Sequence, residues 1–504
     1  MQLFTERHAA KIVGELSCCD RVVITGTIPG VCYAEGMTSY LRQQKVRIFD
    51  YAKWAEPFRE QIRANAQALA QEEGIAIENL RKAGQRKEEI VSKVLAKRGN
   101  HEGMVHILSA MEGCPTYKPW HDKPSGRTFL KGITGQCLHY YFYFIDKDLG
   151  LCYLRVPTWA PFRLQFYFNG HNALARSLDK RGIAASMLDN AFVKIADWTK
   201  AQTLADTVNE EKLHRKLDRY ARRLCPPIAL FLDGYHWSLM QVEYSTDIVF
   251  RKQDELAPIY EALVRTAVHA VKADHIATFL GRKLNGAYQG EMGNDFETRI
   301  QGTRIKHHMD KASIKMYDKH ALVLRIETKV NDVTFFKHHR RVEHRDGTWE
   351  MKTAPLKKSI YSLSALSELL WASNRRYLEF ISTLDDPSAG LRDLGKIVRP
   401  VREAGRSLPG FNLFDAEHLE LFRTIIDGGF NVNGMQNRHL RERLGKSGHQ
   451  VSRLLKRLRC HGLIKKATRC YKYYLTSLGR RVTATALRLR EMVIIPSLCS
   501  IPVK

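Results

Sequence analysis

The alternation of apolar and polar positions is most regular between Gly302 and Asn331, where three short segments repeat it. Thr303 to Met309, Ser313 to Lys319 and Leu322 to Val330 change side-chain character at nearly every second residue. Successive side chains of a β-strand point to opposite faces, so this period predicts three antiparallel strands joined by two short turns.

The two predicted faces differ in chemistry. One face collects apolar side chains that would pack on a core: Ile305, Ile314, Met316, Leu324, Ile326 and Val330. The other face collects basic side chains around one tyrosine and one glutamate: Arg304, Lys306, His308, Lys315, Tyr317, Lys319, Arg325, Glu327 and Lys329. A solvated sheet face usually mixes both signs of charge, so this array favours a polyanionic ligand.

The rest of the large N-terminal part alternates between helical and strand periods. Residues 5–16 have helical periodicity, and residues 20–26 form a predicted strand. Leu138 to Asp146 and the segments after it predict an antiparallel sheet with helices, whereas the Gly- and Pro-punctuated stretch from Pro115 to Gly132 is expected to be a polar loop. The predicted fold class is a multidomain α+β protein with antiparallel sheets and helices.

The breaks in these patterns suggest five regions. They are an α/β and helical region at 1–100, an antiparallel α+β domain at 101–200, a helical region at 201–400 that includes the basic hairpins of 302–331, a compact helical module at 410–484 and a tail at 485–504. Gly405, Pro409 and Gly410 mark the clearest boundary, because they interrupt a helical pattern.

The module at 410–484 has the most specific pattern of the chain. An amphipathic helix at 416–427 and a short helix at 437–444 precede the run from His449 to Ile464, in which Gly462 ends a third helix. A basic β-hairpin and a further helix follow. This order resembles a winged helix-turn-helix domain of the type found in MarR regulators.

That resemblance implies that the third helix enters a DNA major groove while the hairpin contacts the backbone. The side chains it assigns to nucleic acid are Gln450, Arg453, Lys456, Arg457, Arg459, Lys465, Lys466 and Arg469. Glu442 is the only acidic residue between Gln436 and Val482, which fits an electrostatic footprint on phosphate.

Composition supports a polyanionic partner. The 504 residues contain 80 Lys and Arg against 53 Asp and Glu, a formal net charge of +27. No apolar run is long enough to cross a bilayer, so nucleic acid, and double-stranded DNA first, is a better candidate than a membrane. The ten cysteines are scattered and contain no C-x-x-C pair, which favours a reducing cytoplasm over a disulfide framework or a structural zinc site. The oligomeric state is left open.

The whole chain also resembles a family of uncharacterised bacterial proteins. The resemblance rests on the D-R-V-V-x-x-G opening near Asp20, the strand near His139, the I-K-M-Y-D-K…L-R-I-E-T segment and the C-terminal module. It brings no assigned activity.

A second, local resemblance concerns Y-x-K followed by L-R-x-E. This arrangement is similar to that of replication-initiator and relaxase-type proteins of phages and plasmids, in which a tyrosine attacks a DNA phosphate. It implies Tyr317 as the nucleophile and Glu327 as its partner, with Lys315, Lys319 and Arg325 stabilising the phosphate charge. The His-hydrophobic-His metal motif of such proteins is missing, because His139 and His171 do not form that pair.

Three hypotheses therefore remain open. The chain is a replication-initiator or mobile-element type DNA-binding protein that cuts and joins strands through Tyr317. Alternatively, it is a nuclease in which Asp318 and Glu327 hold Mg²⁺ or Mn²⁺ and Lys329 positions water. Alternatively, it is a non-enzymatic DNA-binding regulator. Glu243 and Asp247, four residues apart on one predicted face, are additional candidates for metal or acid–base chemistry.

Overall fold

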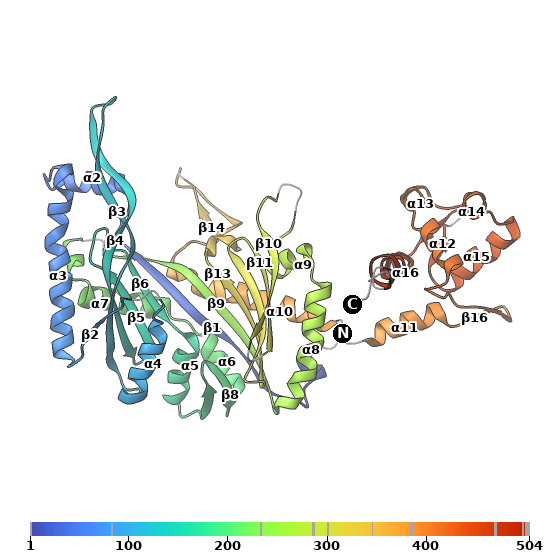
Figure 1. Ribbon diagram of the computed structural model, residues 1–504, viewed down its shortest axis with the longest axis horizontal. Helices are drawn as coiled ribbons and strands as arrows, with labels where there is room; N and C mark the ends of the chain where they lie inside the picture. Colours follow the sequence, from blue (N-terminus) through green and yellow to red (C-terminus); the bar gives the residue numbers. More distant parts are fainter. Residues whose placement is uncertain are drawn as a thin grey trace, which may run out of the picture. The chain divides into compact units, whose positions relative to one another are not determined.

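The computed structural model describes residues 3–81, 84–231, 234–284, 288–299, 302–344, 346–383, 387–467, 471–495 and 498. The chain divides into two compact units, Met1–Asp385 and Asp386–Lys504, and each has its own hydrophobic core (Figure 1). Within the described residues, no helix is both long and apolar enough to cross a membrane.

An eleven-stranded sheet forms the centre of the first unit. Its order is β10-β11-β12-β13-β9-β1-β6-β5-β4-β3-β2, and only β2 and β3 are parallel. The strands are β1 (Ile12–Thr27), β2 (Ile77–Asn79), β3 (Gly103–Asp122), β4 (Arg127–Asp146), β5 (Gly150–Pro157), β6 (Leu164–Phe168), β9 (His236–Phe250), β10 (Met292–Arg299), β11 (Gly302–Met309), β12 (Ala312–Lys319) and β13 (Val323–Val330).

Helices pack against one apolar face of this sheet. Buried residues such as Val22, Val242 and Ile326 point to that face and join a single large core. The helices that contribute buried residues to it are α1 (Phe4–Arg7), α2 (Ala34–Gln43), α3 (Tyr51–Glu72), α7 (Glu210–Leu224), α8 (Gln253–Ala270), α9 (Ala273–Phe279) and α10 (Leu363–Thr383).

The opposite, polar face is covered only in part. Two smaller cores hold α4 (Lys87–Arg98) over β3–β5, and α5 (Gly170–Asp179) and α6 (Trp198–Asp206) over β1, together with the hairpin of β7 (Ala185–Leu188) and β8 (Ala191–Ile195). The strands β1, β9 and β13 carry charged side chains on this face.

The three strands predicted from 303 to 330 are confirmed almost residue for residue as β11, β12 and β13. Lys306 pairs with Lys315, and Tyr317 pairs with Arg325, so the predicted basic face is one face of the sheet. The predicted apolar set is buried in the large core. Asp310 and the pair His320–Ala321 adopt positive φ, so the tight turns form without glycine.

The regions expected at 1–100, 101–200 and 201–400 do not form separate compact units. Strands from all three pair side by side in the one sheet, with β1 between β9 and β6. The boundary between units lies at Asp385, earlier than the expected break near Gly405. Hydrogen bonding between segments far apart in sequence, which local periods do not report, produces this difference.

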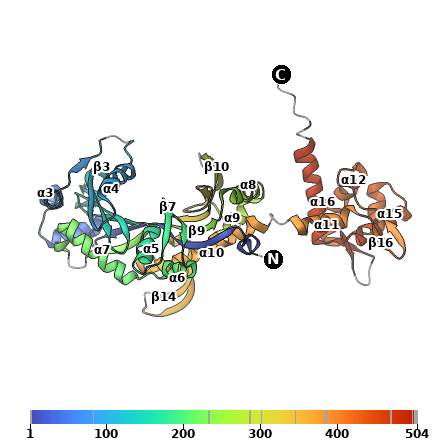
Figure 2. The same cartoon turned by 90° about the horizontal axis from the view of Figure 1, so that it is seen from below.

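Two local predictions are wrong. Residues 5–16 are not one helix, because α1 ends at Arg7 and β1 begins at Ile12. The expected loop at 115–132 is the outer part of a long hairpin in which β3 and β4 pair from Gly103 to Asp122 (Figure 1). Pro115 and Pro119 lie within β3, and only Gly126 of the glycines in this stretch sits at the turn with positive φ. A second hairpin, β14 (Lys337–Glu343) with β15 (Trp349–Pro355), stands out from the sheet (Figure 2).

The second unit is mostly helical. Its elements are α11 (Pro387–Val398), β16 (Val401–Glu403), β17 (Arg406–Leu408), α12 (Ala416–Ile425), α13 (Gly428–Asn433), α14 (Asn437–Leu444), α15 (Gly448–Cys460), β18 (Ile464–Lys466), β19 (Tyr473–Leu475), α16 (Ser477–Arg488) and a π-helical turn (Leu489–Ile494). The predicted order of helices and hairpin is confirmed at the level of these elements, whereas the first half of the expected 485–504 tail is helical.

Candidate functional site

The strands β1, β9 and β13 bring together charged residues from three distant parts of the sequence. Across β9 and β13, Glu243 pairs with Lys329, Ser245 with Glu327 and Asp247 with Arg325. Paired residues in an antiparallel ladder share a face, so these side chains all belong to the polar face. The expectation that Glu243 and Asp247 share a face is therefore confirmed.

A β-bulge adds Asp20 to this set. Cys19 of β1 pairs with Tyr244 and Arg21 pairs with Glu243, which leaves Asp20 as an extra residue between two ladder positions. An extra residue in one strand redirects side chains locally and is common beside active sites. Here the bulge lets Asp20 approach the polar face that Arg21 also shares.

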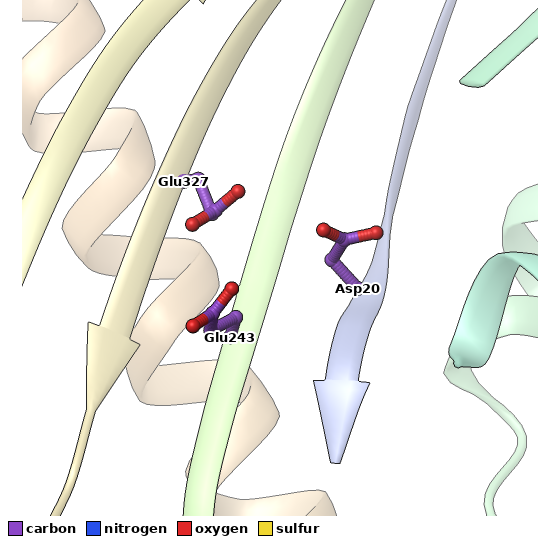
Figure 3. Close-up of side chains that lie close together, drawn as sticks. All are labelled: Asp20, Glu243 and Glu327. Carbon is purple, nitrogen blue, oxygen red and sulfur yellow. The ribbon is translucent and has the colours of Figure 1, made fainter. Parts of the chain in front are cut away.

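Asp20, Glu243 and Glu327 form a carboxylate triad. One oxygen of each lies within 4.8 Å of the corresponding oxygens of the other two (Figure 3). The side chains are 11%, 13% and 2% exposed, respectively. An all-oxygen donor set suits hard divalent cations such as Mg²⁺ and Mn²⁺. The triad is therefore a candidate metal centre.

Basic side chains flank two members of the triad. The ammonium group of Lys315 lies 2.5 Å from one oxygen of Glu327, and the hydroxyl of Tyr317 donates to the other oxygen at 2.7 Å. The ammonium group of Lys329 lies 3.3 Å from Glu243. These contacts hold the carboxylates in place and leave positive charge at the edge of the triad.

Next to the triad on the same face, a buried ion pair connects β9 and β13. The guanidinium of Arg325, which is 0% exposed, donates from Nε and Nη2 to the two carboxylate oxygens of Asp247, each at 2.6 Å. Burial alone would raise the pKa of Asp247, but attraction to Arg325 and hydrogen bonds from His171 and Arg325 outweigh burial and lower it. Asp247 is therefore a carboxylate at neutral pH.

His171 connects this ion pair to the triad. Its Nδ1 lies 3.1 Å from Asp20 and its Nε2 lies 3.6 Å from Asp247. Burial and the charge of Arg325 would lower the pKa of His171, but the charge of nearby Cys18 and the hydrogen bonds to Asp20 and Asp247 outweigh them and raise it well above the usual range. Asn169, the N-cap of α5, fixes the start of the helix that carries His171. The guanidinium of Arg325 also lies 3.2 Å from Nε2 of His171.

Asn190, in the turn between β7 and β8, covers the site from the other side. Its amide nitrogen donates to Asp20 at 2.6 Å, and its backbone carbonyl accepts from Arg325 at 2.8 Å. Its side-chain oxygen accepts from Lys319. Burial and the nearby Arg325 lower the pKa of Lys319.

The polar face carries more positive than negative charge. Four carboxylates, at Asp20, Glu243, Asp247 and Glu327, face five basic side chains, at Arg21, Lys315, Lys319, Arg325 and Lys329. The Nη1 of Arg325 is buried without a hydrogen-bond partner and lies 3.5 Å from Asp20. This balance suits an anionic substrate beside a bound cation.

The structure brings together all five residues proposed for catalysis, namely Tyr317, Glu327, Arg325, Lys315 and Lys319, but in roles other than those expected. The hydroxyl of Tyr317 donates a hydrogen bond to Glu327. Burial, and after it the charge of Glu327, raises the pKa of Tyr317 well above the usual range. A phenol held protonated in this way is a poor nucleophile.

The expected metal pair of Asp318 and Glu327 is wrong. Asp318 pairs with Leu324, a core residue, and so points to the opposite face from Glu327. Glu327 instead lies with Asp20 and Glu243, and Lys329 lies beside Glu243.

The expected phosphate contacts of β11 gather around a carboxylate of the neighbouring strand. Asp295 of β10 lies 2.9 Å from Lys306 and 3.7 Å from His308. Arg304 also lowers the pKa of Asp295, after Lys306 and His308. This end of the basic face is therefore partly neutralised within the sheet.

In the second unit, some of the predicted nucleic-acid contacts are exposed and others are used internally. Arg453 of α15 and Lys465 and Lys466 of β18 are exposed. Arg457 donates from Nε to the carbonyl of Pro409 at 2.9 Å and lies 4.0 Å from the ring centre of Phe411.

Three further predicted contacts have partners inside the unit. Lys456 and Arg459 both contact Glu403, at 3.3 and 3.1 Å. The side chain of Gln450 accepts from the backbone of Ser447 in a capping box. Arg469 lies outside the described residues.

Sequence reasoning missed Asp20, His171 and Asn190 as members of the site. Asp20 was noted only within the D-R-V-V opening, and His171 only as an isolated histidine. For Asp20 the signal is an acidic residue inside an otherwise apolar strand, and for His171 it is the helix-capping Asn169 two residues before it.

Comparisons with protein-family models, with curated proteins and with solved structures found no match.

Proposed function

We propose that this protein is a divalent-metal-dependent phosphodiesterase that cleaves DNA strands. The observation that carries the proposal is the convergence of Asp20, Glu243 and Glu327 within 4.8 Å on three neighbouring strands of a basic face. Mg²⁺ or Mn²⁺ bound by these three residues would activate water and polarise a phosphate oxygen.

The chain's own residues supply orientation and charge. Lys315 and Lys329 sit beside two of the three carboxylates, where their ammonium groups would stabilise negative charge on a phosphate oxygen. Arg325 and His171 contact Asp20 through their charged or polar nitrogens, and the amide of Asn190 donates a hydrogen bond to it. A bound metal would supply an activated water as the nucleophile in place of Tyr317, since that phenol is protonated and donates to Glu327.

For the second unit we propose a winged-helix fold that binds double-stranded DNA. The supporting features are the α14–α15 pair, the β18–β19 hairpin after it and the exposed cations Arg453, Lys465 and Lys466. The resemblances to MarR-type regulators and to a family of bacterial proteins belong to the same proposal, as does a location in the bacterial cytoplasm.

A cleavage assay on supercoiled and single-stranded DNA tests the proposal. Wild-type protein should nick DNA with Mg²⁺ or Mn²⁺ and not with EDTA. Glu243→Gln should reduce cleavage by more than about 100-fold, because loss of a direct ligand exceeds the effect expected for an outer-shell partner. Asp318→Asn, a carboxylate change on the opposite face, is the matched control and should cleave like wild type.

Absence of cleavage with either metal and with both forms of DNA would reject the enzymatic proposal. Salt-dependent DNA binding without cleavage would then leave a non-enzymatic DNA-binding regulator as the better description. Equal loss of activity in Glu243→Gln and Asp318→Asn would show that the triad is not the metal centre.

A further inference from the structure

The outer part of the β3–β4 hairpin is a second basic surface that the proposed active site does not include. Between Gly113 and Gln136 the sequence has four basic residues, Lys118, Lys123, Arg127 and Lys131, and one acidic residue, Asp122. All four basic side chains are exposed. We call residues 113–136 the arm; its base packs on α2, where Leu130 is buried, and its tip extends beyond the helices of the first unit (Figure 1).

The cations of the arm differ from those of the metal centre in their partners. Lys315, Lys329 and Arg325 each contact a carboxylate, whereas none of the arm's four basic side chains has an ion pair with any residue that the structure describes. Lys118 and Lys131 lie directly opposite each other across the two strands. Like charges in that arrangement destabilise a hairpin, so a polyanion that neutralised them would gain affinity.

An exposed tryptophan fixes these two lysines. Trp120 is 42% exposed, and the ammonium groups of Lys118 and Lys131 lie 5.7 and 5.0 Å from its ring centre. Such cation–π contacts restrain flexible side chains. Because both ammonium groups lie over the indole, the ring is better suited to presenting charge than to stacking on an unpaired base.

The arm and the metal centre belong to the same side of the sheet. In β4, Lys131 is an even number of residues from Tyr141 and Tyr143, so the three side chains lie on the same side of the sheet. Tyr143 pairs with Tyr153, Tyr153 pairs with Tyr167, and the guanidinium of Arg21 lies 5.1 Å from the ring centre of Tyr167. The arm and the bulge at Asp20 therefore lie on the same side of one sheet, and α4 packs over the tyrosines between them.

The length of this path indicates the size of the substrate. Twelve residues of strand separate Tyr143 from Lys131, about 40 Å at roughly 3.3 Å per residue. That exceeds one turn of B-form DNA, about 34 Å. A two-stranded β-ribbon also has the width that a DNA major groove admits.

We infer that the arm binds double-stranded DNA flanking the cleavage point, with Lys118 and Lys131 contacting phosphates at least one helical turn away. The substrate of the proposed phosphodiesterase is then a duplex that extends at least one turn from the metal centre. The position of the arm relative to the cleavage point rests on the proposed function, whereas its binding to duplex DNA does not.

Fluorescence anisotropy with a labelled 30-bp duplex, full-length protein and EDTA measures this binding without cleavage. Lys118→Ala/Lys131→Ala should lower the slope of log affinity against log salt by about 1.8, because two phosphate contacts are lost. Lys118→Arg/Lys131→Arg should keep the wild-type slope. Lys53→Ala/Lys252→Ala removes two exposed lysines near the helices of the apolar face and should also keep it.

An unchanged slope in the arm variant, or an equal change in the Lys53/Lys252 control, would overturn the inference. A slope change seen with a 30-nucleotide single strand and not with the duplex would overturn the duplex assignment. Loss of DNA cleavage by Glu243→Gln does not bear on this measurement, so the two proposals fail separately.

Discussion

Arg325 and Asp247 face each other across β13 and β9, and two guanidinium nitrogens donate to the two carboxylate oxygens at 2.6 Å each. Both side chains are almost completely buried. Removing one partner leaves an uncompensated charge in the sheet, so Arg325→Met should destabilise the protein by about 3–5 kcal/mol. Denaturant unfolding measures this change in the free energy of unfolding.

A double variant provides the control for this pair. Arg325→Met/Asp247→Leu removes both buried charges and should be less destabilised than Arg325→Met alone, because apolar replacements often substitute well for a buried ion pair. A double variant that is as unstable as the sum of its two single variants would show that the residues act independently.

Tyr317 should be dispensable for phosphodiester cleavage. In Tyr317→Phe the carboxylate of Glu327 loses one donor at 2.7 Å but keeps Lys315. We expect cleavage within about tenfold of wild type and a loss of stability of about 1 kcal/mol. A gel assay for nicked DNA, with a denaturing step to trap protein–DNA adducts, measures cleavage, and denaturant unfolding measures the change in stability. A covalent adduct that disappears in Tyr317→Phe would instead support the tyrosine mechanism.

Acid should weaken the fold through the site carboxylates. The pKa values of Asp20 and Asp247 are lowered, since contacts with His171 and Arg325 outweigh burial. Below the ordinary Asp pKa of about 3.9 the unfolded chain binds protons that the folded chain does not. The free energy of unfolding therefore decreases as the pH is lowered. The expected slope is up to about 1.4 kcal/mol per pH unit for each carboxyl.

Unfolding free energies measured between pH 3 and pH 7 test this slope. Asp247→Asn removes one titrating carboxyl, so the variant should lose less stability than wild type over the same acid range, whatever its stability at pH 7. Parallel pH profiles for the two proteins would contradict the lowered pKa of Asp247. His171, whose pKa is raised, contributes stability that is fully present below the ordinary His pKa of about 6.5 and is lost as the pH rises from there through the raised value.

Two arginines of α15 should have different effects. Arg453 is exposed, so Arg453→Ala should lower the salt slope of duplex DNA binding by about 1 and leave stability unchanged. Arg457 contacts the Pro409 carbonyl and Phe411, so Arg457→Ala should destabilise the second unit by about 1–3 kcal/mol. Salt-dependent anisotropy and thermal unfolding separate the two effects. The opposite pattern would argue against the proposed winged-helix docking.

Local sequence patterns predicted the strands of 302–330 because every determinant is local there. Apolar and basic residues alternate with period two, and the two turns are short enough to fix the register. The helices of the second unit were predictable for similar reasons, because Ser447 and Gly462 mark the ends of α15.

The carboxylate triad could not be read in the same way. Asp20, Glu243 and Glu327 are more than 80 residues apart in sequence, and only the pairing of β1, β9 and β13 brings them together. No local period reports which strands will be neighbours. The β3–β4 arm was missed for another reason, because its prolines and glycines are typical of loops although the strands pair throughout.

The bulge at Asp20 also sets how β1 tolerates changes in length. Strand side chains alternate with period two, so the extra residue reverses which positions of β1 face the polar side on either side of it. Deleting one residue near Cys19 would restore a regular ladder and at the same time withdraw the aspartate from the triad. The spacing of residues along this strand is therefore constrained as strictly as the identity of the aspartate, and at the other positions of β1 a conservative substitution should be tolerated better than a single-residue insertion or deletion.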